Sequence, residues 1–332
     1  MKARFSTRIG AVVAAAGLVA GLGACSSDDT KSTAGQSQDN IKVVTSTKVW
    51  ADIADAVTDD EKVSIDPIIS SNDIDPHSYE PAASDMAKVE KADILIAGGG
   101  HYDAWLTSSL RDTQDKVIIS ALPTDEHGHD HEHEGEDAHD HEHEGHDHDH
   151  EGEEGHDHEE HDDTHEHHHD GETNEHIWYD TDAVEETAQQ LTDALTKKGA
   201  KADMNAVDKE LKAIEKSKSK IKAAKVAQVH PLADDILKDT KVKDITPKGY
   251  RQSTLNESEP SAADVNEMLK LIESGDLDYL IDAPQTHDQV SQRLVEAAKA
   301  KGVKIINVYE SPSADQSFFD LYKQTLSELE SA

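Results

Sequence analysis

The segment IKVVTSTKVWADIADAV, residues 41–57, decides the fold class. Its first five residues, 41–45, are rich in β-branched side chains and predict a buried strand. The apolar residues that follow recur at the i, i+3, i+4, i+7 spacing of one helix face, at Trp50, Ile53, Ala54 and Val57. A strand leading through a short connection into a helix is the unit from which parallel sheets are built.

The same alternation continues along the chain. Further strands are predicted at 63–70, 94–97, 117–119, 226–229, 242–246, 277–281 and 303–308, and further helices at 82–91, 183–197, 260–272, 289–301 and 318–329. Residues 202–225 contain neither glycine nor proline, so they predict one long helix that links two halves. The expected architecture is therefore α/β, with two lobes, 41–201 and 226–332, each holding a parallel sheet flanked by helices.

The composition limits the function. The chain has 332 residues, enough for two hydrophobic cores, and 70 acidic against 32 basic residues. This excess of acid argues against nucleic acid as a partner, because a surface that binds phosphates needs a basic face. Residues 125–172 hold 23 of the acids, 17 histidines and no lysine or arginine. We expect this tract to be a disordered insertion in the first lobe when no metal is bound.

The N-terminus predicts export. Three basic residues within the first eight positions precede an apolar stretch at 9–23, which is typical of a signal peptide over residues 1–24. The sequence LGAC at 22–25 resembles a bacterial lipobox, so we expect Cys25 to carry the lipid that anchors a monomeric protein to the bacterial cell membrane, outside the cytoplasm. A free thiol after an ordinary cleavage site is the alternative. Residues 25–40 are expected to form a flexible tether.

Five histidines lie outside the tract. His77, His176 and His230 fall at the ends of predicted strands or in nearby loops, where parallel sheets bind their ligands. His101 and His287 are expected to be structural or surface residues. A single histidine near a strand end is more often structural than a metal ligand, so the three become informative only together.

Four motifs, in order along the chain, resemble one known family. They are Asp-Pro-His-Ser-Tyr-Glu-Pro at 75–81, a glycine-rich turn before a tryptophan at 98–105, His-Ile-Trp at 176–178 and Glu-Pro-Ser at 259–261. Together they resemble the metal-binding lipoproteins of bacterial zinc and manganese ABC importers. The resemblance runs from residue 41 to the end, with the tract as an insertion, and it implies a binding protein that delivers a metal ion to an ABC-type permease.

The resemblance also implies the metal ligands. These are His77, His176, His230 and a carboxylate after the last strand, which in this chain is Glu310. The family more often has aspartate at that position, so a water molecule is the alternative fourth ligand. Three imidazoles and one carboxylate suit tetrahedral Zn²⁺, whereas Mn²⁺ prefers more oxygen ligands. Zinc uptake is therefore the expected function.

The tract repeats a metal-binding pattern. The heptapeptide His-Asp-His-Glu-His-Glu-Gly occurs at 129–135 and 139–145, and a copy with one change occurs at 146–152. We expect its histidines to form weak auxiliary zinc sites. They are His129, His131, His133, His139, His141, His143, His146, His148 and His150. The alternative is an acidic loop that serves only solubility.

Two other functions remain open from the sequence. A zinc-dependent hydrolase would use three histidines and keep one zinc position for water, but outside the His-rich tract the chain contains neither His-Glu-x-x-His nor Gly-x-Ser-x-Gly. A surface zinc buffer or adhesin without a transport role would have the same sequence features. We expect a transport protein and not an enzyme.

Overall fold

The computed structural model describes residues 40–72, 74–108, 116–122 and 174–332. The signal peptide, Cys25 and the whole His-rich tract lie outside the described residues, so the expectations about them stay predictions.

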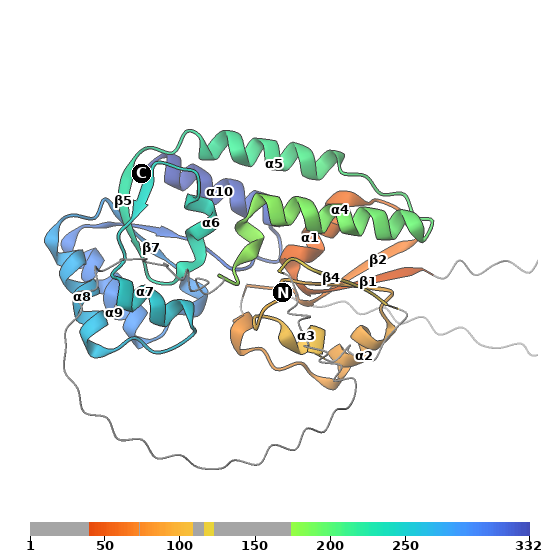
Figure 1. Ribbon diagram of the computed structural model, residues 1–332, viewed down its shortest axis with the longest axis horizontal. Coiled ribbons are helices and arrows are strands. Elements are labelled where there is room, and N and C mark those ends of the chain that lie inside the picture. Colours follow the sequence, from red (N-terminus) through yellow and green to blue (C-terminus); the bar gives the residue numbers. More distant parts are fainter. Residues whose placement is uncertain (1–39, 73, 109–115, 123–173) are drawn as a thin grey trace, which may run out of the picture. The chain divides into compact units, whose positions relative to one another are not determined.

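The first half of the fold is a four-stranded parallel sheet (Figure 1). Its strands are β1 (Ile41–Thr47), β2 (Val63–Ile69), β3 (Ile94–Ala97) and β4 (Val117–Ser120), in the order β2-β1-β3-β4. The central strand β3 is fully buried, as expected for a strand covered on both faces. Helices α2 (Ala83–Lys91) and α3 (Ala104–Ser108) also belong to this half.

The second half repeats the topology. Strands β5 (Ala224–Gln228), β6 (Val242–Asp244), β7 (Tyr279–Asp282) and β8 (Lys304–Asn307) form a parallel sheet in the order β6-β5-β7-β8. Helices α6 (Asp234–Leu237), α7 (Lys248–Leu255), α8 (Ala262–Ser274) and α9 (Gln289–Lys301) lie around it. Two of them, α8 and α9, end at left-handed glycines, Gly275 and Gly302, as helix C-termini often do. The predicted two-lobed α/β fold with parallel sheets is therefore confirmed.

Four helices join the two sheets. Helices α1 (Lys48–Val57) and α4 (Thr181–Lys197) come from the first half, α10 (Phe318–Glu330) from the second, and α5 (Asn205–Lys218) leads from one to the other. They pack on one another, and Figure 1 shows α4 and α5 running beside each other. The backbone N–H of Phe318 also donates to the carboxylate of Asp52 in α1, at 2.8 Å.

The linking helix is shorter than the predicted range of 202–225. Asn205 is its first residue, and the carboxylate of Asp203 just before the helix accepts the backbone N–H of Asn205 at 2.9 Å. At the other end, the hydroxyl of Ser219 donates to the carbonyl of Lys216 at 2.7 Å, which offers the backbone an alternative to continuing the helix. The chain then extends from Ala224 as β5, because this segment pairs with two neighbouring strands.

One hydrophobic core serves both sheets. It contains side chains from strands of each half, such as Val43 and Tyr279, together with Leu191 of α4 and Leu326 of α10. Two smaller clusters cover the other sheet faces, one around Leu95 and one around Leu294. The helical layer and its core therefore hold the two sheets as one body.

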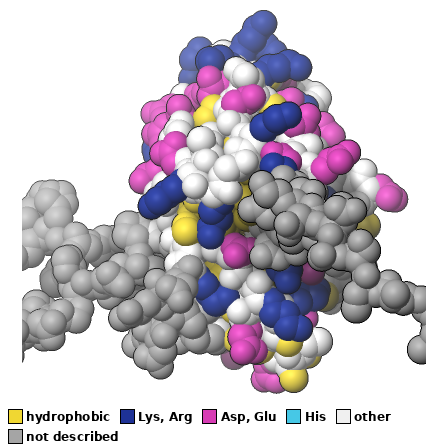
Figure 2. All heavy atoms as spheres, turned by 90° about the vertical axis from the view of Figure 1, so that its right-hand side faces the viewer, with side chains coloured by type: hydrophobic (Ala, Val, Ile, Leu, Met, Phe, Trp, Pro, Cys, Tyr) yellow, Lys and Arg dark blue, Asp and Glu magenta, His cyan; other side chains and the backbone are white. Residues whose placement is uncertain are grey.

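The surface carries both signs of charge. Figure 2 shows one face of the molecule, on which several basic side chains gather at the upper edge and acidic and basic side chains are interspersed below it. None of the described helices is long and apolar enough to cross a membrane.

Candidate metal centre

Four side chains from distant parts of the chain meet between the two sheets. One ligand atom each of His77, His176, His230 and Glu310 lies within 4.8 Å of all the others. His77 and His176 belong to the first half of the fold, and His230 and Glu310 to the second. The sequence grouped the same four residues, and the structure brings them together.

His77 lies in a short 3₁₀ helix, Pro76–Ser78. The carboxylate of Asp75 accepts the backbone N–H of His77 at 3.0 Å and caps this turn. Pro76 fixes the backbone at the first position of the turn. These restraints direct the imidazole toward Glu310, whose Oε1 lies 3.1 Å from its Nε2.

His176 is buried, with 3 % of its surface exposed, and its two ring nitrogens have different partners. Nδ1 lies 2.7 Å from Oδ1 of Asn174, and Nε2 lies 3.3 Å from Nε2 of His77. The amide of Asn174 donates in turn to Asp234 Oδ2 at 2.8 Å, across the two halves. If Nδ1 donates its proton to Asn174, Nε2 presents a lone pair to the centre, which is how metal-binding histidines are oriented.

His230 follows β5 and precedes a 3₁₀ turn that starts with Pro231. Its Nε2 lies 3.0 Å from Nε2 of His176. The side chain of Gln228 supports this turn, because its Oε1 accepts the backbone N–H of Ala233 at 2.9 Å and its Nε2 donates to Asp234 at 2.7 Å. The segment after the strand is thus fixed by buried hydrogen bonds.

Glu310 is the most buried member of the group, with 1 % of its surface exposed. Gln285 holds its backbone, since Oε1 of Gln285 accepts the N–H of Glu310 at 2.7 Å and of Ser311 at 3.2 Å. Its Oε1 faces the histidines at 3.1 Å from His77, 3.7 Å from His176 and 4.0 Å from His230. Its Oε2 accepts a hydrogen bond from the hydroxyl of Tyr102 at 3.2 Å.

The electrostatics of the group follow from this burial and pairing. Burial lowers the pKa of His77, but the bonded Glu310, with Glu257 and Asp75, outweighs it and raises that pKa to about 9. Burial also lowers the pKa of His230, and the neighbouring His176 and His77 lower it further, well below the ordinary value. Burial opposes ionisation of Glu310, yet hydrogen bonds from His176 and His77 hold the pKa of this carboxyl below its usual range.

The spacing of the four donors suits one small cation. A tetrahedral zinc ion with bonds of about 2.0–2.1 Å requires its ligand atoms to lie about 3.3 Å apart. Five of the six separations among these donor atoms range from 3.0 Å between His230 and His176 to 4.0 Å between His230 and Glu310, and all four donors lie within 4.8 Å of one another. The arrangement can therefore accept a tetrahedral ion once the wider pairs of donors move closer, by up to about 1.5 Å.

A cavity of about 340 Å³ opens beside His77 and His230. Its lining includes the carboxylates of Asp75, Glu257 and Asp288. Glu257 is half exposed and its Oε1 lies 3.1 Å from Nδ1 of His77. Negative charge along this opening favours a cation over an anion.

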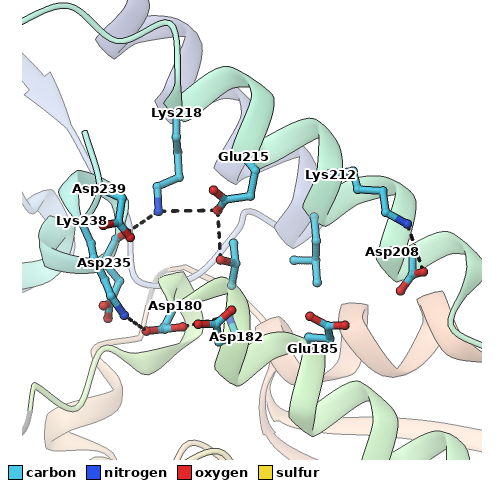
Figure 3. Close-up of a pocket in the computed structure, with 12 residues that line it drawn as sticks. Asp180, Asp182, Glu185, Asp208, Lys212, Glu215, Lys218, Asp235, Lys238 and Asp239 are labelled. Atoms are coloured by element: carbon cyan, nitrogen blue, oxygen red, sulfur yellow. Dashed lines mark hydrogen bonds and ion pairs between the residues drawn. The ribbon is translucent and has the colours of Figure 1, made fainter. Parts of the chain in front are cut away.

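A second cavity, of about 470 Å³, lies between α4, α5 and α6, away from the histidines (Figure 3). Figure 3 shows that lysines face several of its carboxylates. Lys238 bonds Asp180 at 2.8 Å, Lys212 bonds Asp208 at 3.3 Å, and Lys218 lies 3.7 Å from Glu215. Since these acids have lysine partners, we interpret the cavity as a solvated groove between helices and not as the functional centre.

The other histidines and the tryptophans have structural environments. His101 is fully exposed, with Nδ1 3.0 Å from Glu175, and Nε2 of His287 lies 2.7 Å from Asp282. Neither belongs to the cluster of four. Trp50 and Trp178 are buried in the core, and the Trp178 ring also packs edge-on against His176 at 5.3 Å.

Sequence reasoning missed three residues that contact the centre, namely Tyr102, Asn174 and Glu257. Asn174 lies two residues before His176, and Tyr102 lies within the glycine-rich motif, so proximity to a motif was the available signal for both. For Glu257 the nearby Glu-Pro-Ser sequence was the only hint.

Comparison with known proteins gives one family match over most of the chain. The family described as zinc-uptake complex component A, periplasmic, matches residues 43–332. A manganese-binding lipoprotein of Halalkalibacterium halodurans is 30% identical over 102 residues, which is 30% of this chain and 32% of that protein. A manganese ABC transporter substrate-binding lipoprotein of Streptococcus gordonii is 34% identical over 100 residues, 29% of this chain and 31% of that protein. These alignments thus span about a third of the length of either curated relative.

Solved structures match the whole fold at lower identity. The laminin-binding protein of Streptococcus agalactiae, described as a bifunctional protein with adhesin and metal-transporting activity, has a TM-score of 0.57 and 17% identity, with 88% of this chain and 97% of that chain covered. The Zn(II)-bound ZnuA-like domain of Streptococcus pneumoniae AdcA has a TM-score of 0.54 and 18% identity, with 88% and 98% covered. At these identities the matches show the fold alone.

Proposed function

Since the chain belongs to the family of periplasmic zinc-uptake components, which are substrate-binding transport proteins and not enzymes, we propose that it captures Zn²⁺ and delivers it to an ABC-type permease. The observation that carries the proposal is the meeting of three imidazole nitrogens and one carboxylate oxygen within 4.8 Å, between the two sheets. The ion is the cargo of the protein, and His77, His176, His230 and Glu310 are its ligands.

The donor set favours zinc among the metals of related proteins. Relatives are named for manganese or iron, and the family for zinc, so family membership leaves the metal open. Three nitrogens and one oxygen in a tetrahedral arrangement match the ligands that proteins use for Zn²⁺. Mn²⁺ favours oxygen ligands and binds nitrogen-rich sites more weakly than Zn²⁺.

The geometry gives less support to hydrolysis. A catalytic zinc site keeps one position for a water molecule. Here Glu310 is buried within reach of the other three donors and supplies a fourth protein ligand, so the proposed site has no open position. A zinc-binding adhesin shares every feature of the site, and genomic neighbours or growth under zinc limitation distinguish it from a transporter.

The proposal includes the cellular position. Relatives named lipoproteins support lipidation of Cys25 and a place outside the cytoplasm, where a monomer tethered to the membrane can reach a permease. Radiolabelled fatty acid should label the wild-type chain, and Cys25→Ser should lose that label.

The tract at 125–172 has a separate proposed role, which is to collect zinc loosely near the tight site. Its 17 histidines give it more metal ligands than solubility requires. Deleting the tract should leave one tight zinc ion per chain and remove several weak ones in titration calorimetry. An unchanged number of bound ions contradicts this role.

The tight site is tested by substitution in the full chain, with a competing chelator that keeps zinc off the weak sites. His176→Ala should lower zinc affinity by more than about a hundredfold, because losses of outer partners alone typically cost 10–100-fold. His77→Ala and His230→Ala should act in the same direction. His287→Ala is the matched control, because His287 lies outside the cluster and should leave affinity unchanged. If all four variants bind zinc as tightly as the wild type does, the proposal is wrong.

A further inference from the structure

The two oxygens of the Glu310 carboxylate have different surroundings. Oε1 faces the three histidines, with its shortest contact 3.1 Å from His77. Oε2 instead accepts a hydrogen bond from the hydroxyl of Tyr102 at 3.2 Å. Tyr102 has only 4 % of its surface exposed, so no bulk water competes for this bond.

The position of Tyr102 is fixed on all sides. Its ring packs edge-on against His77, with centroids 4.8 Å apart, and lies against Trp178 at the same distance with the two rings tilted by 49°. Glu175 holds its backbone, since Oε2 of Glu175 accepts the N–H of Tyr102 at 2.7 Å. The hydroxyl is therefore held toward Glu310 by the fold and not by a flexible side chain.

The turn before Tyr102 allows this placement only because it is made of glycine. Gly99 and Gly100 have φ values of +95° and +64°, in the left-handed region. A Cβ on Gly100 would lie 2.6 Å from the carboxylate of Glu175. The carboxylate of Asp103 accepts the backbone N–H of Gly98 at 2.6 Å and of Gly99 at 2.9 Å. The glycine-rich motif thus serves to aim one hydroxyl at the centre.

We propose that Tyr102 is a specificity-determining residue, which selects four-coordinate zinc by occupying Oε2 of Glu310. With Oε2 held by the hydroxyl, the carboxylate offers the ion a single oxygen and the site stays at four ligands. A carboxylate free to bind with both oxygens adds a fifth ligand and a second oxygen, which suits Mn²⁺ better than Zn²⁺.

The anchor of the Glu310 backbone strengthens this effect. Gln285 binds the N–H groups of Glu310 and Ser311, so the carboxylate adjusts mainly by rotating its own side chain. The bond from Tyr102 opposes that rotation. A charge-assisted bond in a buried site is among the stronger hydrogen bonds of proteins, so its loss should be measurable.

The inference rests on the proposed metal site. Its test distinguishes a failure of that site from a failure of the role proposed for Tyr102. Zinc affinity of the full chain is measured by chelator competition, and manganese affinity by the electron paramagnetic resonance signal of free Mn²⁺. Tyr102→Phe keeps the ring and removes only the hydroxyl. We expect the ratio of zinc to manganese affinity to fall by about tenfold, as for the loss of one hydrogen bond to a charged group. X-ray absorption of the zinc form should show coordination rising from four toward five.

Tyr322→Phe is the matched control. Tyr322 is equally buried, and its hydroxyl donates to the carbonyl of Tyr179 at 2.8 Å, without touching the four ligands. This variant should keep the wild-type ratio. Tyr102→Leu, which also lacks the hydroxyl, should shift the ratio in the same direction as Tyr102→Phe.

Each remaining outcome is decisive. If Tyr102→Phe binds both metals as the wild type does, or loses both to the same extent, Tyr102 does not determine specificity. If the wild type itself binds neither metal tightly, the proposed function fails, and the inference fails with it.

Discussion

His77 lies between two carboxylates, with Glu310 at Nε2 and Glu257 at Nδ1, and this sets its charge before any metal arrives. Its pKa of about 9 means that the metal-free protein carries a proton on His77 at neutral pH. Zinc must displace a proton from Nε2, so the apparent affinity should rise about tenfold per pH unit until pH approaches 9. Calorimetry in buffers of different ionisation enthalpy should detect about one proton released by His77 at pH 7.

The same shift has the opposite effect on the metal-free fold. A raised histidine pKa stabilises the folded state fully below the ordinary value of 6.5, and this contribution disappears as pH rises through about 9. His77→Gln should remove both effects, the proton release and this loss of stability at alkaline pH. Zinc affinity that is independent of pH between 6 and 8 contradicts the assigned charge.

Single residues of the centre were predictable where a motif marks them. His77, His176, His230 and Glu310 follow strands or occur in recognisable motifs, and the resemblance to a known family grouped them. Tyr102 and Glu257 were not predictable in the same way. Tyr102 meets Glu310 across 208 residues of chain, and such a contact exists only after both halves fold.

At the scale of elements, the turn after β3 should be more sensitive than other turns with the same backbone conformation. Gly99 and Gly275 both have φ near +90°, at +95° and +82°. A Cβ on Gly99 would lie 2.5 Å from the Ser120 hydroxyl, whereas a Cβ on Gly275 would meet nothing within 4 Å. Gly275→Ala should cost about 1 kcal/mol of strain, and Gly99→Ala clearly more, because it adds a clash to the same strain.

Urea denaturation of the two variants measures this difference. Gly99→Ala should also weaken zinc binding, since the turn positions Tyr102, while Gly275→Ala should leave binding unchanged. Equal losses of stability in the two variants contradict the clash.

The bounds of helices and strands were predictable where the pattern of apolar residues within the segment itself sets them. The helix at 289–301 has the predicted bounds, and the strand predicted at 63–70 is observed as Val63–Ile69. The length of the linking helix was overestimated, because the absence of glycine and proline does not show at which residue a helix ends. Its end depends on the Ser219 cap and on strand pairing from Ala224, and the pairing is a tertiary contact.

At the scale of the whole molecule, the shared core predicts that both halves unfold together. The three tryptophans, Trp50, Trp105 and Trp178, all belong to the first half, so their fluorescence reports on that half alone. Leu294 in α9 lies in the core cluster of the second half and is fully buried. Leu294→Ala should cost about 2–5 kcal/mol, as large-to-small changes in cores do.

If the continuous core couples the sheets, this distant substitution must shift the tryptophan transition and the circular dichroism transition to the same lower urea concentration. The sequence predicts two lobes joined by a helix, and such lobes could unfold either together or independently. The shared core, which includes Leu191 and Leu326, is the reason to expect that they unfold together. A tryptophan transition that stays at the wild-type midpoint while circular dichroism becomes biphasic shows that the lobes unfold separately. In that case ligands from both halves must be brought together by the metal itself, and zinc should restore a single transition.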